Sequence, residues 1–289
     1  MAHVMAQVMD WTKRHPIGAF LAWFTVVGQG FAVIPLLFTN VPSEVFIFGS
    51  TVVGMLLPAL IITRIVDGRA GLRRLWDRIV RVGVSPGWYA FALLILPVPA
   101  IIMALLLFGG PDAGTSVPAA FLYGFLLQGA IVFILINLWE EVAVMGFLQA
   151  RLQARHGPLK AVMLTALFFT YQHITLVIAS GSFAAALVFF LVTVIGFRAL
   201  MAWTYNRTGS LFIVGLLHAS SNAVTGGSGF FGSGLLGILY ASESFATALQ
   251  MVAALIIGLI LMAATRGRLG VAEEGRDDRR RGTEPIRQA

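Results

Sequence analysis

The chain of 289 residues contains no cysteine, and it has few charged residues. Without cysteine, the protein can form neither a disulfide nor a thiolate ligand for a metal ion. Asp, Glu, Lys and Arg make up 11% of the sequence, whereas an ordinary soluble domain carries roughly 25% charged residues. With so few charged residues, most of the chain cannot have the charged, water-exposed surface of an ordinary soluble domain.

Long apolar runs take the place of the missing charges, and 58% of the residues are hydrophobic. About 18–20 apolar residues are enough to cross a hydrocarbon core of ~30 Å as a helix, which satisfies its own backbone hydrogen bonds in lipid. The sequence therefore predicts an all-α polytopic membrane protein with eight transmembrane helices. These helices are predicted at 17–38, 46–65, 88–108, 118–151, 159–178, 183–205, 210–225 and 245–265.

Lys and Arg are missing from one side of the predicted spans. Because these residues concentrate in cytoplasmic loops, both termini are predicted to be cytoplasmic. The membrane itself is predicted to be a bacterial plasma membrane. The net charge of +7 then follows from topology, so no nucleic-acid partner is predicted. The predicted organisation is a cytoplasmic N-terminus (1–16), a membrane domain (17–265) and a disordered cytoplasmic tail (266–289).

Only a few ionisable side chains lie deep within the predicted spans: Glu140 and Glu141 in the fourth, His173 in the fifth, Arg198 in the sixth and His218 in the seventh. Each costs on the order of 2–3 kcal/mol at membrane depth, so such residues mark functional sites by default. At ~1.5 Å per residue from the inner helix ends, their depths are compatible with one layer. Helices 4, 5 and 7 are therefore predicted to form a buried polar site.

Each of these residues also has a structural explanation when it is taken alone. A single His or Asn in a membrane helix most often makes a hydrogen bond between helices. Asn222 lies one turn beyond His218 on the same helix face, and Phe169, one turn before His173, would by itself be a packing residue. As a set, however, a carboxylate pair, two imidazoles and a carboxamide are suited to activating water, by a base alone or with a metal.

Three short motifs also carry a family resemblance. In order and on separate predicted helices, they resemble those of the CPBP/Abi family of intramembrane proteases, which includes the type II CAAX prenyl endopeptidases. The resemblance extends over residues 118–225. The motifs are EEVAVMG (140–146), FTYQH (169–173) and HASSN (218–222).

The resemblance implies an intramembrane endopeptidase that hydrolyses a peptide bond of a membrane-associated peptide or protein. Glu140 and Glu141 would both be catalytic residues, with Glu140 as the general base toward water, and His173 would hold that water. His218 and Asn222 would stabilise the oxyanion of the tetrahedral intermediate. Members are often called metalloproteases, so a divalent metal such as zinc is a predicted cofactor. Its predicted ligands are Glu140, His173, His218 and Asn222.

One position departs from the family pattern, because Met145 stands where the family usually has Arg. An Arg there would lie four residues from Glu141 on the same helix face and would keep it ionised. We predict that Arg198 pairs with Glu141 instead and that Phe169 is a second supporting residue. An alternative is that Arg198 extends its side chain to the inner membrane interface.

Two other functions stay open at this point. A proton-coupled transporter would also place acids and histidines in the membrane, although transporters often show inverted repeats and the sequence has none. A non-catalytic immunity or scaffold protein of the same family would bind a peptide without cutting it. In all three cases, the predicted partners are the lipid bilayer and, for the protease and the scaffold, a membrane-associated peptide or protein.

Overall fold

The computed structural model describes residues 2–38, 40–225, 233–240 and 243–271. All regular secondary structure in these segments is helical, which confirms the predicted all-α class. Some α-helices join through π-helical segments at Phe24–Gly28, Ser50–Leu56, Phe121–Leu127, Phe133–Asn137 and Val142–Gln149. The α-helices are α1 (Ala2–Arg14), α2 (Pro16–Trp23), α3 (Gln29–Leu37), α4 (Ser43–Gly49), α5 (Leu57–Val66), α6 (Gly68–Ile79), α7 (Pro86–Leu94), α8 (Pro97–Phe108), α9 (Val117–Ala120), α10 (Gln128–Val132), α11 (Leu138–Glu141), α12 (Ala150–His156), α13 (Pro158–Gln172), α14 (Ile174–Ala179), α15 (Phe183–Thr208), α16 (Leu211–Thr225), α17 (Leu235–Tyr240) and α18 (Glu243–Ala264).

Six continuous helices within the described residues are long and apolar enough to cross a membrane. Several such helices make this an integral membrane protein that contacts the lipid bilayer. The cytoplasmic location of the termini and the bacterial membrane stay predictions. The six helices are Pro16–Leu37, Ser43–Val66, Pro86–Phe108, Val117–His156, Phe183–Thr208 and Ala246–Ala264.

The other two of the eight predicted spans are not among these long helices. The predicted span 159–178 is divided into α13 and α14 at His173, whose backbone leaves the helical conformation (φ −95°, ψ 15°). The predicted span 210–225 is α16, which has 15 residues. Almost all of α16 is buried, and it contacts α7, α10, α11, α15 and α18. Helix length thus supports six complete spans, and eight stays a prediction.

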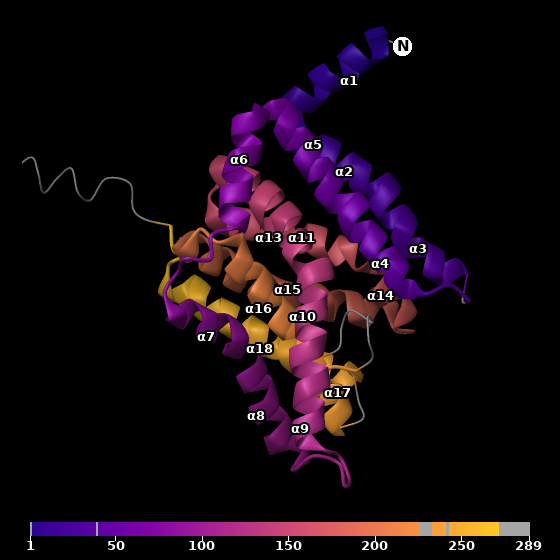
Figure 1. Ribbon diagram of the computed structural model, residues 1–289, viewed down its shortest axis with the longest axis vertical. Coiled ribbons are helices and arrows are strands. Elements are labelled where there is room, and N and C mark those ends of the chain that lie inside the picture. Colours follow the sequence, from indigo (N-terminus) through magenta and orange to yellow (C-terminus); the bar gives the residue numbers. More distant parts are fainter. Residues whose placement is uncertain (1, 39, 226–232, 241–242, 272–289) are drawn as a thin grey trace, which may run out of the picture.

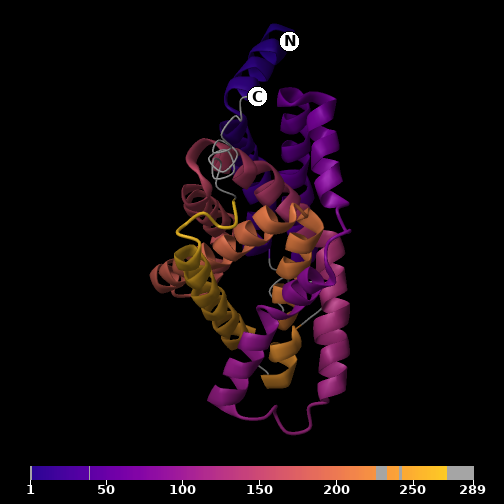
Figure 2. The same ribbon diagram turned by 90° about the vertical axis from the view of Figure 1, so that its left-hand side faces the viewer.

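The long helix Val117–His156 contacts helices from distant parts of the chain (Figures 1 and 2). Its 40 residues are about twice the number needed to cross the hydrocarbon core, as the long fourth apolar run predicted. Its first half lies beside α16 and α17, and its second half contacts α5, α6 and α13. The two acids of the first motif lie between these halves, where helices from distant parts of the sequence meet.

Helices α15 and α18 cross at a pair of glycines. A Cβ atom added at Gly196 would lie 2.3 Å from the Cα atom of Leu255, and one added at Gly258 would lie 2.3 Å from the Cα atom of Gly196. Only glycine permits this approach of two backbones, as is common between membrane helices. The crossing holds the part of α15 that carries Arg198.

Residues 266–271, which follow α18, pack against α15. Leu269 is fully buried, and its carbonyl accepts a hydrogen bond from Nδ2 of Asn206 at 2.8 Å. The predicted disorder of 266–289 is therefore wrong for these first residues, because an apolar side chain and a backbone carbonyl both find partners on α15. Residues 272–289 lie outside the described part of the chain.

Candidate active site

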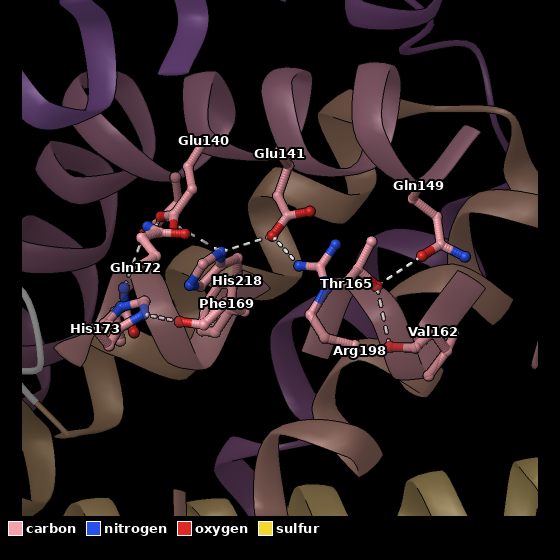
Figure 3. A network of polar contacts seen from close by, with 12 residues as sticks. Glu140, Glu141, Gln149, Val162, Thr165, Phe169, Gln172, His173, Arg198 and His218 are labelled. Atoms are coloured by element: carbon pink, nitrogen blue, oxygen red, sulfur yellow. Dashed lines mark hydrogen bonds and ion pairs between the residues drawn. The ribbon is translucent and has the colours of Figure 1, made fainter. Parts of the chain in front are cut away.

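The two adjacent acids lie on α11, a four-residue α-helical stretch between two π-helical segments. Single π-helical turns within helices frequently occur at functional sites. Both acids are buried, with 3% of Glu140 and none of Glu141 exposed. Figure 3 shows both carboxylates on one side of their helix, in a network that includes His218.

Glu141 forms the charged half of this network. Its Oε1 atom lies 2.7 Å from Nη1 of Arg198 and 2.9 Å from Nδ1 of His218. Arg198 is fully buried, so it does not extend to the membrane interface. The predicted Arg198–Glu141 ion pair is thus present (Figure 3). It places a cation beside Glu141 although Met145 occupies the usual position of the motif arginine.

Aromatic rings surround the ion pair. The Phe169 ring centroid lies 5.4 Å from Cζ of Arg198, 4.4 Å from the His173 ring and 5.8 Å from the His218 ring. Phe197 approaches His218 edge-on at 5.1 Å. These rings keep water from the ion pair, and a cation over a ring face gains a further favourable interaction. Phe169 therefore lies where a supporting residue was predicted.

Glu140, by contrast, accepts its hydrogen bonds from neutral amides. Its Oε1 atom accepts a hydrogen bond from Nε2 of Gln172, and its Oε2 atom lies 3.5 Å from Nδ2 of Asn137. Nδ1 of His218 is 4.0 Å from Glu140, which is too long for a hydrogen bond. Asn222 reaches Glu140 only indirectly, because its Nδ2 atom donates to Oδ1 of Asn137 at 3.3 Å.

His173 lies where α13 ends and α14 begins. Its ring Nδ1 is 2.9 Å from the carbonyl oxygen of Phe169. This contact assigns the proton of the neutral imidazole to Nδ1, since a carbonyl can only accept, and it leaves a lone pair on Nε2. The ring is half-buried beside Phe169, so Nε2 is the atom that can accept a hydrogen bond from water.

Three carboxamide side chains near the acids were not predicted: Gln172, Asn137 and Gln29. Gln29 belongs to α3 in the first span, and its Nε2 atom donates to the carbonyl of Tyr171 at 2.7 Å. It thereby satisfies a carbonyl that is freed where α13 ends. The signal that could have found them is their position inside apolar runs, where an amide also needs a partner. The prediction considered ionisable side chains, a motif phenylalanine and no amide other than that of Asn222.

The glycine of the first motif has a packing role. A Cβ atom added at Gly146 would lie 2.9 Å from the Cδ1 atoms of both Leu211 and Leu75. The long helix therefore packs closely on the start of α16 and on α6. Met145 is fully buried in the hydrophobic cluster that includes these two leucines.

The predicted zinc site can be tested against this geometry. No group of three or more His, Asp or Glu side chains within the described residues gathers closely enough to hold a metal ion. Of the predicted ligands, His218 directs Nδ1 to Glu141 and Asn222 directs its amide to Asn137. These side chains do not form a closed metal site, but the Nδ1 contacts of His173 and His218 leave both Nε2 atoms available, as in a His that binds a metal. A zinc ion stays a prediction.

Comparison with known families assigns the central part of the chain. The family model described as type II CAAX prenyl endopeptidase Rce1-like matches residues 122–224. This segment contains all three motifs and agrees with the predicted core at 118–225, so the suspected resemblance is confirmed. A comparison with curated proteins finds no match to the chain.

Proposed function

Because residues 122–224 are Rce1-like, we propose that the protein is an intramembrane endopeptidase whose catalytic residues are Glu140, His173, His218 and Asn222. Its substrate is a membrane-associated peptide or protein. Side chains from three motifs, carried by α11, α13 and α16, surround one buried acid pair. That convergence is the single observation that carries the proposal. Glu141 and Arg198 stabilise the charges of the site.

The reaction begins with a water molecule between Glu140 and Nε2 of His173. The Glu140 carboxylate takes a proton from this water, whose oxygen attacks the carbonyl carbon of the scissile bond. The carbonyl oxygen becomes an oxyanion in the tetrahedral intermediate. The intermediate then breaks its C–N bond, and the proton held by Glu140 passes to the leaving amine. Glu140 is suited to this role because its hydrogen bonds come from two neutral amides, and its ionisable neighbour His218 is 4.0 Å away and is hydrogen-bonded to Glu141 instead.

Stabilising the oxyanion requires N–H or O–H groups that can donate a hydrogen bond to it. The hydrogen bonds that His218 and Asn222 already make determine which of their N–H groups are available. Because His218 uses Nδ1–H toward Glu141, it can donate from Nε2 only in its doubly protonated form. The neighbouring Glu141 carboxylate stabilises such an imidazolium. Asn222 donates one N–H to Asn137 and retains a second for the substrate.

A cleavage assay tests the proposal. The full-length protein is reconstituted into liposomes with a library of membrane-anchored peptides, and products are identified by mass spectrometry. We expect wild-type protein to release fragments and Glu140→Gln to release none. Glu44→Gln, at the first turn of α4, serves as the matched control and should cleave like wild type.

The competing functions predict different results in the same liposomes. Peptide binding without cleavage by the wild type would favour a non-catalytic scaffold or immunity protein. Proton-coupled flux that Glu140→Gln abolishes would favour a transporter. Cleavage that persists in Glu140→Gln would overturn the assignment of the base.

A further inference from the structure

The first helix, α1 (Ala2–Arg14), has an apolar face that the rest of the described chain leaves largely exposed, although the end near Trp11 and Thr12 contacts the start of the first span. Five large apolar side chains of α1 are exposed, with exposed fractions between 44% and 62%. At 100° per residue they fall on one side of the helix. They are Val4, Met5, Val8, Met9 and Trp11.

The opposite face of α1 is polar and makes its own hydrogen bonds. His3 and Gln7 are in contact through Nε2 of each side chain at 3.0 Å, and Asp10 forms an ion pair with Arg14 one turn on. Lys13 and Arg14 give the last turn a positive charge. Separate apolar and charged faces are the signature of a helix that lies in a membrane interface.

The position of α1 in the molecule identifies what covers its apolar face. The first span begins at Pro16, directly after α1 ends at Arg14. Figure 1 shows α1 turning away from α2 and extending past the helical bundle, and its tertiary contacts are with α2 and α5. The helix therefore extends from the end at which the first span leaves the membrane.

The positive charge of α1 and of the nearby α6 favours an anionic lipid surface. The helix α6 (Gly68–Ile79), at the same end of the molecule (Figure 1), exposes Arg69, Arg73 and Arg74 as well as the apolar ring of Trp76. Basic residues of this kind are attracted to anionic headgroups of the cytoplasmic leaflet. Lys13 and Arg14 extend the same positive surface.

We propose that α1 is an interfacial anchor that inserts Val4, Val8 and Trp11 into the headgroup boundary of an anionic phospholipid leaflet. The anchor holds the cytoplasmic end of the first span. It does not depend on the proposed protease activity.

The absence of cysteine in the wild-type chain permits a clean test. Val8→Cys on the apolar face and Gln7→Cys on the polar face are each spin-labelled in the full-length protein, in vesicles of phosphatidylcholine with phosphatidylglycerol. Collision rates with oxygen, which concentrates in lipid, and with a nickel chelate, which stays in water, are compared. We expect the oxygen-to-nickel ratio to be severalfold higher at position 8 than at position 7.

Removing the anionic lipid or the positive charge should reduce that ratio at position 8. The comparison uses pure phosphatidylcholine vesicles and a Lys13→Gln/Arg14→Gln variant that also carries Val8→Cys. Equal ratios at positions 7 and 8 would overturn the proposal. So would strong spin–spin broadening at position 8 that disappears on dilution with unlabelled protein, because it would identify a second copy as the occupant.

Discussion

Glu140 and Glu141 are neighbours in the sequence, yet they lie in different electrostatic surroundings. Glu141 shares one oxygen between the Arg198 guanidinium and the His218 imidazole. Glu140 is held by the amides of Gln172 and Asn137. An ion pair fixes the charge of one acid, whereas neutral donors orient the other and leave it able to take up a proton. Identity of residue type therefore does not imply identity of role, and this contrast separates a structural acid from a proposed reactive one.

The strongest way to break this comparison is to neutralise each acid separately. Glu140→Gln removes the proposed base and should lower kcat by about 100- to 10,000-fold, with thermal unfolding close to that of wild type. Glu141→Gln leaves the buried Arg198 without its counter-charge and should lower the free energy of unfolding by about 3–5 kcal/mol. Peptide cleavage and denaturant unfolding in detergent measure the two effects. If the effects were exchanged between the two variants, the assignment of roles would be wrong.

Arg198 provides the second test, because it is the cation of the charged half. Arg198→Met should destabilise the protein by about 3–5 kcal/mol, since the buried Glu141 then loses its guanidinium counter-charge and keeps only the contact to His218. Arg198→Met/Glu141→Gln should regain most of that loss, and a double-mutant cycle of unfolding free energies measures the coupling. Additive effects in the cycle would contradict a direct ion pair.

Moving the positive charge from position 198 to position 145, where the family motif usually has Arg, tests the same ion pair with Glu141. Met145→Arg added to Arg198→Met should recover part of the lost stability and activity, because position 145 follows Glu141 by about one helical turn. Recovery will be incomplete, since Met145 is fully buried among apolar side chains. Met145→Leu with Arg198→Met is the matched control and should recover nothing. Equal recovery by Leu would mean that packing rather than charge is responsible.

Removing the hydrogen bond from Gln172 to Glu140 should have a smaller effect. Gln172→Met keeps the shape of the side chain but removes the donor to Glu140, and a hydrogen bond to a charged group contributes about 1.5–3 kcal/mol. We expect kcat to fall by roughly 10- to 100-fold, with KM nearly unchanged. Thr165→Val is the control. Thr165 lies on α13, as Gln172 does, and the change removes its buried hydrogen bond to Gln149 at 2.7 Å. A loss of kcat in both variants alike would indicate general loosening of α13.

Several features could be predicted from the sequence because they follow from the cost of charge in lipid. A buried Arg198 needed an anion, and the missing motif arginine left Glu141 as the unpaired acid, so the pair could be inferred without coordinates. The positions of the long helices followed from apolar run length in the same way. The roles of the motif residues came from the family resemblance.

Other features depended on contacts that the sequence pattern does not contain. Gln172 precedes His173 directly, so on a continuous helix the two side chains would point about 100° apart. In the structure α13 ends at Gln172, and His173 follows outside the helix. Gln29 from the first span satisfies the carbonyl of Tyr171 at this break. The predicted fifth span did not include that break, whereas the predicted seventh span matches the short, buried α16 closely.

Metal dependence is the smallest effect that we expect. The predicted ligands Glu140, His173, His218 and Asn222 do not form a metal-binding cluster in this arrangement. Treating the purified protein with a zinc chelator should therefore leave kcat on a cleaved peptide within about twofold of the untreated value, or less than 0.5 kcal/mol in activation free energy. Activity that is lost with the chelator and restored by added zinc would instead make the Nε2 atoms of His173 and His218 metal ligands, because their Nδ1 atoms already have hydrogen-bond partners. A metal beside Glu140 would bind its carboxylate, and Glu140 would then have to serve as a ligand as well as a base.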